Sequence, residues 1–173
     1  LALLLRQWRM PGAPQVQRAV RVPVGFDGVD MEVRAYPMTG FVDLNVATAA
    51  LLAAVFEIGG GLDKGRATEL AEAVVAARDQ PEYKTAGRRF AAVEDLLQVP
   101  GVDYDFYQRV AELLTVDGLS GGRVNPLAAP LEVLTVLTGG DAAAAEKFAQ
   151  AREEAEIDAQ TLGMNPDFID GTS

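Results

Sequence analysis

Two Ala/Leu-rich stretches, one in each half of the chain, constrain the fold more than any other feature. They are VDLNVATAALLAAVF at Val42–Phe56 and VNPLAAPLEVLTV at Val124–Val136. In both, an Asn follows an apolar residue and precedes an alanine and a leucine at the same spacing. An Asn oxygen placed before a helix accepts hydrogen bonds from the free N–H groups of the first turn. The pattern therefore predicts Asn45 and Asn125 as N-caps of two helices.

A second helix is predicted after each stretch. The glycines Gly59–Gly61 and Gly139–Gly140 end the first helix of each pair. The following helices both contain an apolar pair and an arginine, in AVVAAR at Ala73–Arg78 and KFAQAR at Lys147–Arg152. Two copies of helix, glycine turn and helix predict a duplicated helical unit. The alternative of two unrelated Asn-capped helices in an alanine-rich chain remains open.

A β-hairpin is predicted near the start of the chain. Val20–Phe26 and Val29–Met38 alternate apolar and other residues, with Asp27-Gly28 between them. This alternation around an Asp-Gly pair is a strong hairpin signal. Pro23 and Pro37 place the strands at sheet edges or at bulges, because proline cannot donate to the ladder. The predicted fold class is therefore α+β, mainly helical with a small antiparallel β hairpin.

The remaining segments are predicted to be helices joined by polar loops. Asp63 is an expected N-cap for the second helix. The sequence divides into three parts: the hairpin region 1–41, a first helical unit 42–120 and a second helical unit with the tail, 121–173. The helices are expected at Asn45–Ile58, Asp63–Ala77, Phe90–Leu97, Tyr104–Leu114 and Asp141–Leu162.

The best-known motif is a helix-hairpin-helix turn. It is formed by LLQVPGV followed by VAELL, with Pro100 and Gly101 at the turn. In DNA-binding versions the turn amides hold a phosphate and a basic residue follows the glycine. Here Asp103 and Asp105 follow instead, and their carboxylates repel a phosphate. A structural hairpin is favoured, and a nucleic-acid-binding module is kept as the alternative function.

Composition restricts the chemistry that is available. The chain has no His and no Cys, which excludes disulfides, thiol nucleophiles and imidazole bases. The net charge is −10, yet residues 1–40 hold five arginines against three acidic residues. A strongly acidic helical part repels a phosphate backbone, so nucleic acid is not an expected partner. No catalytic constellation is present, and the expected protein is not an enzyme.

Acidic residues leave calcium as a possible ligand. Asp103 and Asp105 could offer oxygen ligands, as could a later cluster. Neither group copies the spaced ligand loop of an EF-hand, and a solvated acidic face is favoured. A calcium-dependent accessory domain of a hydrolase is a third, weaker reading. The later cluster consists of Glu153, Glu154, Glu156 and Asp158.

Three stretches together carry a family resemblance. They are GFVDLNVATAALLAAVF at Gly40–Phe56, FAAVEDLLQVPGVDYDFYQRVAELLTV at Phe90–Val116 and GRVNPLAAPLEVLTVL at Gly122–Leu137. In this order they resemble the periplasmic part of a K-type minor pseudopilin of the type II (general) secretion pathway. The chain departs from that family at Tyr36–Thr39, where an acidic pair is usual, and at Leu127–Ala129, where Asn-Thr-Ala is usual.

The resemblance implies a truncated pilin-like core carrying a duplicated helix-hairpin-helix (SAM-like) domain. It implies a non-catalytic protein at the pseudopilus tip that binds the I- and J-type minor pseudopilins and initiates or caps the filament. Some family members bind calcium in the helical part. The implied location is the periplasmic domain of a bacterial inner-membrane-anchored protein.

No stretch of this chain is apolar enough to span a bilayer, and it starts with LALLL rather than Met. A removed signal or a trimmed anchor is the expectation, and the membrane would be reached only through an N-terminal helix absent from this chain.

Overall fold

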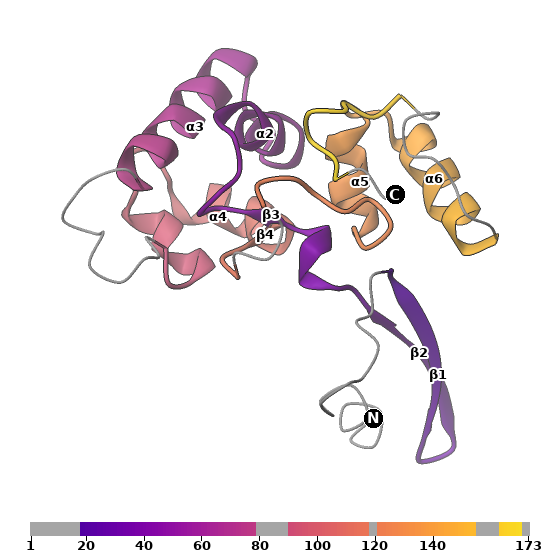
Figure 1. The fold of residues 1–173 in the computed structure, drawn as a ribbon. Helices are drawn as coiled ribbons and strands as arrows, with labels where there is room; N and C mark the ends of the chain where they lie inside the picture. Colours follow the sequence, from indigo (N-terminus) through magenta and orange to yellow (C-terminus); the bar gives the residue numbers. More distant parts are fainter. Residues whose placement is uncertain (1–17, 79–89, 118–120, 155–162, 171–173) are drawn as a thin grey trace.

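A projecting β-hairpin and a helical body make up the fold (Figure 1). The computed structural model describes residues 18–78, 90–117, 121–154 and 163–170, with the side chains of Phe26 and Glu154 left out. The elements are β1 (Val20–Phe26), β2 (Val29–Ala35), the 3₁₀ turn η1 (Met38–Gly40), β3 (Val42–Asp43), α2 (Ala49–Ala54), the π-helical turn η2 (Val55–Gly59), α3 (Lys64–Arg78), the 3₁₀ helix η4 (Val93–Gln98), α4 (Tyr104–Val110), the 3₁₀ turn η5 (Ala111–Leu113), β4 (Leu114–Thr115), α5 (Leu131–Leu137) and α6 (Ala142–Glu154). The predicted mainly helical α+β fold with a small antiparallel hairpin is confirmed.

The hairpin forms where the sequence predicts it. Asp27 and Gly28 have φ angles of 49° and 78°, the left-handed pair that a two-residue hairpin turn requires. The register from Val20 opposite Ala35 to the turn is unbroken, so Pro23 causes no bulge. Within the described residues this sheet has two strands, so both are edges there.

One face of the hairpin is apolar along its length. In the observed register Val22 lies opposite Val33, and Val24 lies opposite Met31. Cross-strand partners point to the same face of a sheet. Val29 and Met31 keep 59% and 45% of their surface exposed. The hairpin is thus an amphipathic ribbon that extends away from the helices (Figure 1).

The first predicted cap is wrong, because Thr48 and not Asn45 caps α2. Thr48 has extended backbone angles, and its hydroxyl accepts a hydrogen bond of 3.2 Å from the Leu51 amide. The helix therefore begins later than predicted. Asn45 instead bonds the main chain of Phe90: its Oδ1 accepts from the Phe90 N–H at 2.9 Å, and its Nδ2 donates to the Phe90 carbonyl at 3.0 Å.

The second predicted cap, Asn125, is also wrong. Helix α5 begins only after Pro130, which makes no side-chain cap. A proline disfavours helical angles at the residue before it, so Ala129 is kept out of the helix. The Asn125 side chain accepts from the Leu127 amide at 3.0 Å, a local turn upstream of the helix.

Replacing the observed cap tests the corrected helix start. Thr48→Ala is expected to lower the free energy of unfolding by about 1 kcal/mol, because the amides of the first turn of α2 lose their acceptor. Urea denaturation followed by circular dichroism measures the change. Thr68→Ala in α3 is the matched control, since that hydroxyl bonds only the Lys64 carbonyl and alanine is the better helix former. Equal stabilities of the two variants would contradict the cap assignment.

Two predicted turn and cap features are confirmed. The Asp63 carboxylate accepts from the Arg66 amide at 3.1 Å at the start of α3. At the helix-hairpin-helix turn, Gly101 has φ of 95° and the Val102 amide donates to the Val99 carbonyl at 3.1 Å. A left-handed residue at this position needs glycine, as the sequence predicts.

The helical predictions around this turn are partly right. The helix predicted at Phe90–Leu97 is the 3₁₀ helix η4. The helix predicted at Tyr104–Leu114 is α-helical in α4 and then tightens into η5. The helix predicted to reach Leu162 is described only as far as Glu154, because residues 155–162 lie outside the described chain.

Two short parallel pairings close the helical body. Strand β3 pairs with β4, and Val124 pairs with Ile169. Helix α2 packs on α3, α5 packs on α6, and α5 also contacts η2. One continuous buried cluster includes Phe56 of the first unit and Phe148 of the second. The described core therefore crosses the predicted boundary between residues 120 and 121.

None of the described helices has the length and apolar character needed to cross a bilayer.

Candidate functional site

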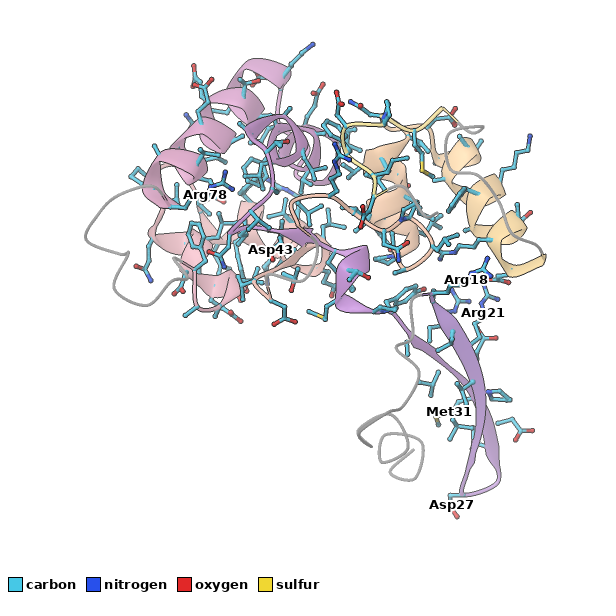
Figure 2. All side chains as sticks on the ribbon, viewed as in Figure 1. Arg18, Arg21, Asp27, Met31, Asp43 and Arg78 are labelled. Atoms are coloured by element: carbon cyan, nitrogen blue, oxygen red, sulfur yellow. The ribbon has the colours of Figure 1, made fainter. Side chains whose placement is uncertain are left out.

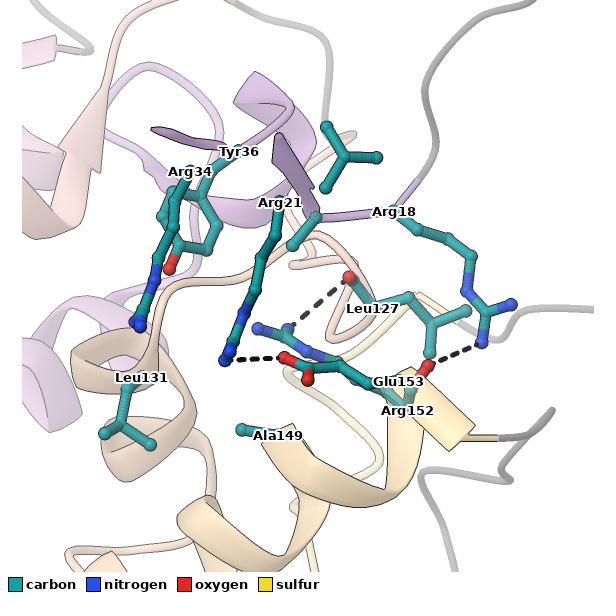
Figure 3. Close-up of a pocket in the computed structure, with 11 residues that line it drawn as sticks. Arg18, Arg21, Arg34, Tyr36, Leu127, Leu131, Ala149, Arg152 and Glu153 are labelled. Atoms are coloured by element: carbon teal, nitrogen blue, oxygen red, sulfur yellow. Dashed lines mark hydrogen bonds and ion pairs between the residues drawn. The ribbon is translucent and has the colours of Figure 1, made fainter. Parts of the chain in front are cut away.

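A groove with a volume of about 460 Å³ lies where the base of the hairpin meets α5 and α6 (Figure 3). The backbone anchors this junction, because the Ala19 amide donates to the Leu127 carbonyl at 2.9 Å. Leu127, Leu131 and Ala149 supply apolar surface in the groove. Its charged lining consists of Arg18, Arg21, Arg34, Arg152 and Glu153. We name it the arginine groove.

Arg152, in the last turn of α6, holds the groove to the loop before α5. Its Nη1 donates to the carbonyls of Ala129 at 2.7 Å and Pro126 at 2.8 Å. Arg18 in turn donates to the Arg152 carbonyl at 3.2 Å, as cationic side chains do at helix C-termini. The floor of the groove is therefore fixed by main-chain contacts.

Arg21 and Arg34 lie opposite each other on the polar face of the hairpin. Figure 3 shows their side chains running side by side toward Leu131 and Ala149. Arg21 contacts Glu153 of α6 at 2.7 Å. Arg34 contacts Glu32 at 2.9 Å, and Arg21 lies 3.9 Å from the same carboxylate. About half of each of these side chains is exposed, so the pairs contribute little to stability.

Arginine predominates among the described residues that line the groove. They include four guanidinium groups and one carboxylate, that of Glu153, and Glu32 outside the lining contacts Arg21 and Arg34, although the chain as a whole carries a net charge of −10. Burial lowers the pKa of the Arg152 guanidinium; Tyr36 and Glu153 oppose this shift, and the charges of Arg21 and Arg18 add to it. The contact with Glu32 raises the pKa of Arg34. Arginines remain charged at physiological pH in either case.

The groove lining contains few groups that take part in bond chemistry. Among the described residues it has one hydroxyl, the Tyr36 phenol, and one carboxylate, that of Glu153, which contacts Arg21. Arginines that cannot deprotonate do not serve as bases. In Figure 2 the Arg18 and Arg21 side chains lie at the hairpin base near α6, whereas Met31 lies further along the hairpin.

None of the four residues predicted to have a structural role lines this groove, whereas Arg152, which ends the second repeated stretch, and Glu153, a candidate calcium ligand, do line it. Asn45, Pro100 and Gly101 lie in the first helical unit, and Asn125 lies in the loop that precedes α5. The structure therefore does not bring the four together, and they act locally in the fold.

Arg78 and Arg152, the last residues of the two repeated stretches, make equivalent hydrogen bonds. Arg78 donates to the Ala47 carbonyl at 2.6 Å, ahead of α2, as Arg152 donates to Ala129 ahead of α5. Figure 2 shows Arg78 at the end of α3. In both units the arginine ending the second helix ties it to the loop before the first. This correspondence favours the predicted duplication, which stays a prediction.

An acidic residue caps the helix that follows the helix-hairpin-helix turn. The Asp103 carboxylate accepts from the Phe106 amide at 2.7 Å at the start of α4. A phosphate at this helix N-terminus would have to compete with that carboxylate for the first-turn amides. The geometry therefore offers no support for the nucleic-acid-binding alternative.

The calcium prediction finds no gathered ligand set in the described part of the chain. Across residues 18–78, 90–117, 121–154 and 163–170, no three Asp or Glu side chains come together as metal ligands. Asp103 caps α4 and Glu153 pairs with Arg21. Glu156 and Asp158 lie outside the described residues, so calcium binding there stays a prediction.

No family model and no curated protein matches this chain.

The arginine groove was missed in the sequence, although part of it could have been found. The excess of arginine in residues 1–40 was visible, and the Asp27-Gly28 turn fixes a register in which Arg21 lies opposite Arg34. Nothing in the sequence, however, indicates that α6 would bring Arg152 and Glu153 to the same place.

Proposed function

We propose that this chain is the periplasmic part of a K-type minor pseudopilin and acts as a non-catalytic assembly protein. It would bind the I- and J-type minor pseudopilins at the tip of a type II secretion pseudopilus and initiate or cap the filament. The proposal rests on the resemblance over Gly40–Leu137. The structural observation that supports it is the amphipathic hairpin, which carries an exposed apolar face and projects from a bulky helical body.

The hairpin is suited to association because its apolar face is available. Val29 and Met31 are large apolar side chains with about half their surface exposed. Within the described part of the chain, each strand also has one edge with no strand beside it. Exposed apolar surface next to free strand edges is typical of protein–protein contacts. The helical body, which is much larger than the hairpin, would limit incorporation to the end of a filament by steric bulk.

The test is assembly with purified partners. Size-exclusion chromatography with light scattering, on this chain mixed with I- and J-type pseudopilin ectodomains from the same organism, is expected to give a 1:1:1 complex. Met31→Glu is expected to weaken that complex roughly tenfold, because a charge would be buried in an apolar contact. Leu97→Glu is the matched control, an apolar-to-acid change at a side chain of similar exposure, 38% against 45%, on η4. Absence of a complex with the unaltered chain would contradict the proposal.

A further inference from the structure

We propose that the outer edge of β2 is a self-pairing surface, where a second copy of this chain adds its own β2 antiparallel to the first. The two hairpins would then form one four-stranded sheet about a twofold axis, with the two Glu32 residues facing each other. Such a contact is isologous, because the same strand edge serves in both chains. The inference does not depend on the proposed role in secretion and goes beyond it.

The hairpin register shows which main-chain groups point outward. Residues that flank a two-residue turn exchange both hydrogen bonds, so Phe26 and Val29 form such a pair. Bonded pairs alternate along an antiparallel ladder, and the N–H and C=O groups of the intervening residues point away from it. In β2 these outward groups belong to Asp30, Glu32 and Arg34. Within the described residues no other strand lies beside them.

The outer edge of β1 is closed to pairing, in contrast to that of β2. By the same alternation its outward positions include Arg21, Pro23 and Gly25. Pro23 has no N–H and so interrupts this edge at its centre. Nearer the helical body, the outward amide of Ala19 already donates to the Leu127 carbonyl at 2.9 Å. Of the two edges of the hairpin, that of β2 therefore offers the unbroken row of donors and acceptors.

The charges along β2 favour a second copy as the occupant. When two β2 strands pair antiparallel over their full seven residues, Asp30 of each lies opposite Arg34 of the other. Opposite charges at facing positions stabilise a sheet. Among the described residues Asp30 makes no ion pair, and Arg34 contacts Glu32 through Nε, one of several guanidinium donors. The central Glu32 carboxylates face each other, but each already contacts Arg34 of its own chain at 2.9 Å.

The neighbouring registers are less favourable. A shift of the pairing by two residues in one direction sets Asp30 against Glu32 of the other copy, and like charges that face each other destabilise a sheet. A shift in the other direction shortens the overlap of the two strands. The full-length register is therefore the one expected.

The apolar face of the hairpin also fits this pairing. Val29, Met31 and Val33 lie on one face of β2, because alternate residues of a strand point the same way. In the full-length register Met31 lies opposite Val33 of the second copy, on the same face. Val29 and Met31 keep 59% and 45% of their surface exposed. The dimer would thus join two apolar faces into one, and its outer edges would be the two β1 strands, where Pro23 opposes further addition.

The concentration dependence of the mass tests the inference. Sedimentation equilibrium of the chain alone is expected to show a reversible change from 18.4 kDa to twice this mass. Glu32→Pro is expected to weaken the dimer roughly tenfold, because it removes the central outward N–H of β2. The hairpin tolerates a proline at such a position, since Pro23 lies directly opposite in an unbroken register. Gly25→Pro is the matched control, because it removes an outward N–H of β1 instead.

Charge reversal separates lost pairing from lost folding and identifies the register. Asp30→Lys and Arg34→Asp are each expected to weaken self-association roughly tenfold, because each sets like charges opposite one another. An equimolar mixture of the two variants is expected to regain the affinity of the unaltered chain, since the introduced lysine would face the introduced aspartate. Glu72→Lys, at an exposed acidic side chain on α3, is the matched control.

Three outcomes would overturn the inference directly. The first is an unaltered chain that stays monomeric up to millimolar concentration. The second is an equal effect of Glu32→Pro and Gly25→Pro, and the third is a mixture of Asp30→Lys and Arg34→Asp that associates no better than either variant alone.

Other occupants of the β2 edge give different results. Slow hydrogen exchange at the Asp30, Glu32 and Arg34 amides of a monomeric chain would overturn the inference in favour of a segment of the same chain. A chain that is monomeric alone but pairs through β2 with a pseudopilin ectodomain would overturn it and support the proposed function. Self-pairing without a pseudopilin complex would support this inference and contradict only the proposed function.

Discussion

Gly40→Ala is expected to lower the free energy of unfolding by about 3 kcal/mol, because the added methyl group has no room. Gly40 is buried at the end of η1, between the hairpin and the helical body. A Cβ at this position would overlap the carbonyl of Ala128 and approach the amide nitrogen of Ala129 to 2.6 Å. These are main-chain atoms, which cannot rotate away as the end of a side chain can. The Asn125 amide, bonded to the Thr39 carbonyl at 2.8 Å, holds the two segments together.

Gly25→Ala is the matched control for this change. Its Cβ would meet only the Asp30 carboxylate, at an ordinary contact distance of 3.6 Å. Urea denaturation followed by circular dichroism should therefore show a large drop in midpoint for Gly40→Ala and almost none for Gly25→Ala. Similar midpoints for the two variants would contradict the close approach of η1 to the loop before α5.

Asn45→Ala is expected to cost about 2 kcal/mol, more than the loss of a helix cap. The side chain exchanges two hydrogen bonds with the main chain of Phe90 and donates a longer one, 3.4 Å, to the Val116 carbonyl. Phe90 is 4% exposed, so its amide and carbonyl would lose their partner where water hardly reaches. A buried N–H or C=O group without a hydrogen-bond partner costs its full desolvation free energy.

The comparison with Thr48→Ala separates the two interpretations of Asn45. A cap at Asn45 would make its removal cost about 1 kcal/mol and leave Thr48 without effect. The structure instead assigns about 1 kcal/mol to Thr48 and the larger loss to Asn45. Thermal or urea denaturation of the two variants under one condition measures both. A smaller loss for Asn45→Ala than for Thr48→Ala would contradict the bonding to Phe90.

Local signals in the sequence predicted the features that depend on neighbouring residues. The Asp27-Gly28 turn, the Asp63 cap and the Gly101 turn each need only a few adjacent residues, and all three are as predicted. The cap at Asn45 failed because an Asn near a helix start satisfies the same local pattern whether or not its side chain bonds elsewhere. Its actual partner, Phe90, is distant in sequence.

Features that depend on distant segments could not be predicted. Strands β3 and β4 are two residues each, too short for any alternation, and they form because the helices bring them together. The arginine groove has the same origin. The hairpin register places Arg21 opposite Arg34, but only the packing of α6 adds Arg152 and Glu153.

The attachments on either side of residues 79–89 have a practical consequence for engineering the chain. Arg78 bonds the carbonyl of Ala47, and Phe90 bonds the side chain of Asn45. The interval thus leaves and rejoins the body at one short run of main chain. Arg78 and Phe90 are both fixed to the short run of main chain from Asn45 to Ala47. A substitution in this run is therefore expected to loosen both attachments at once, so engineering of the chain has to leave it intact.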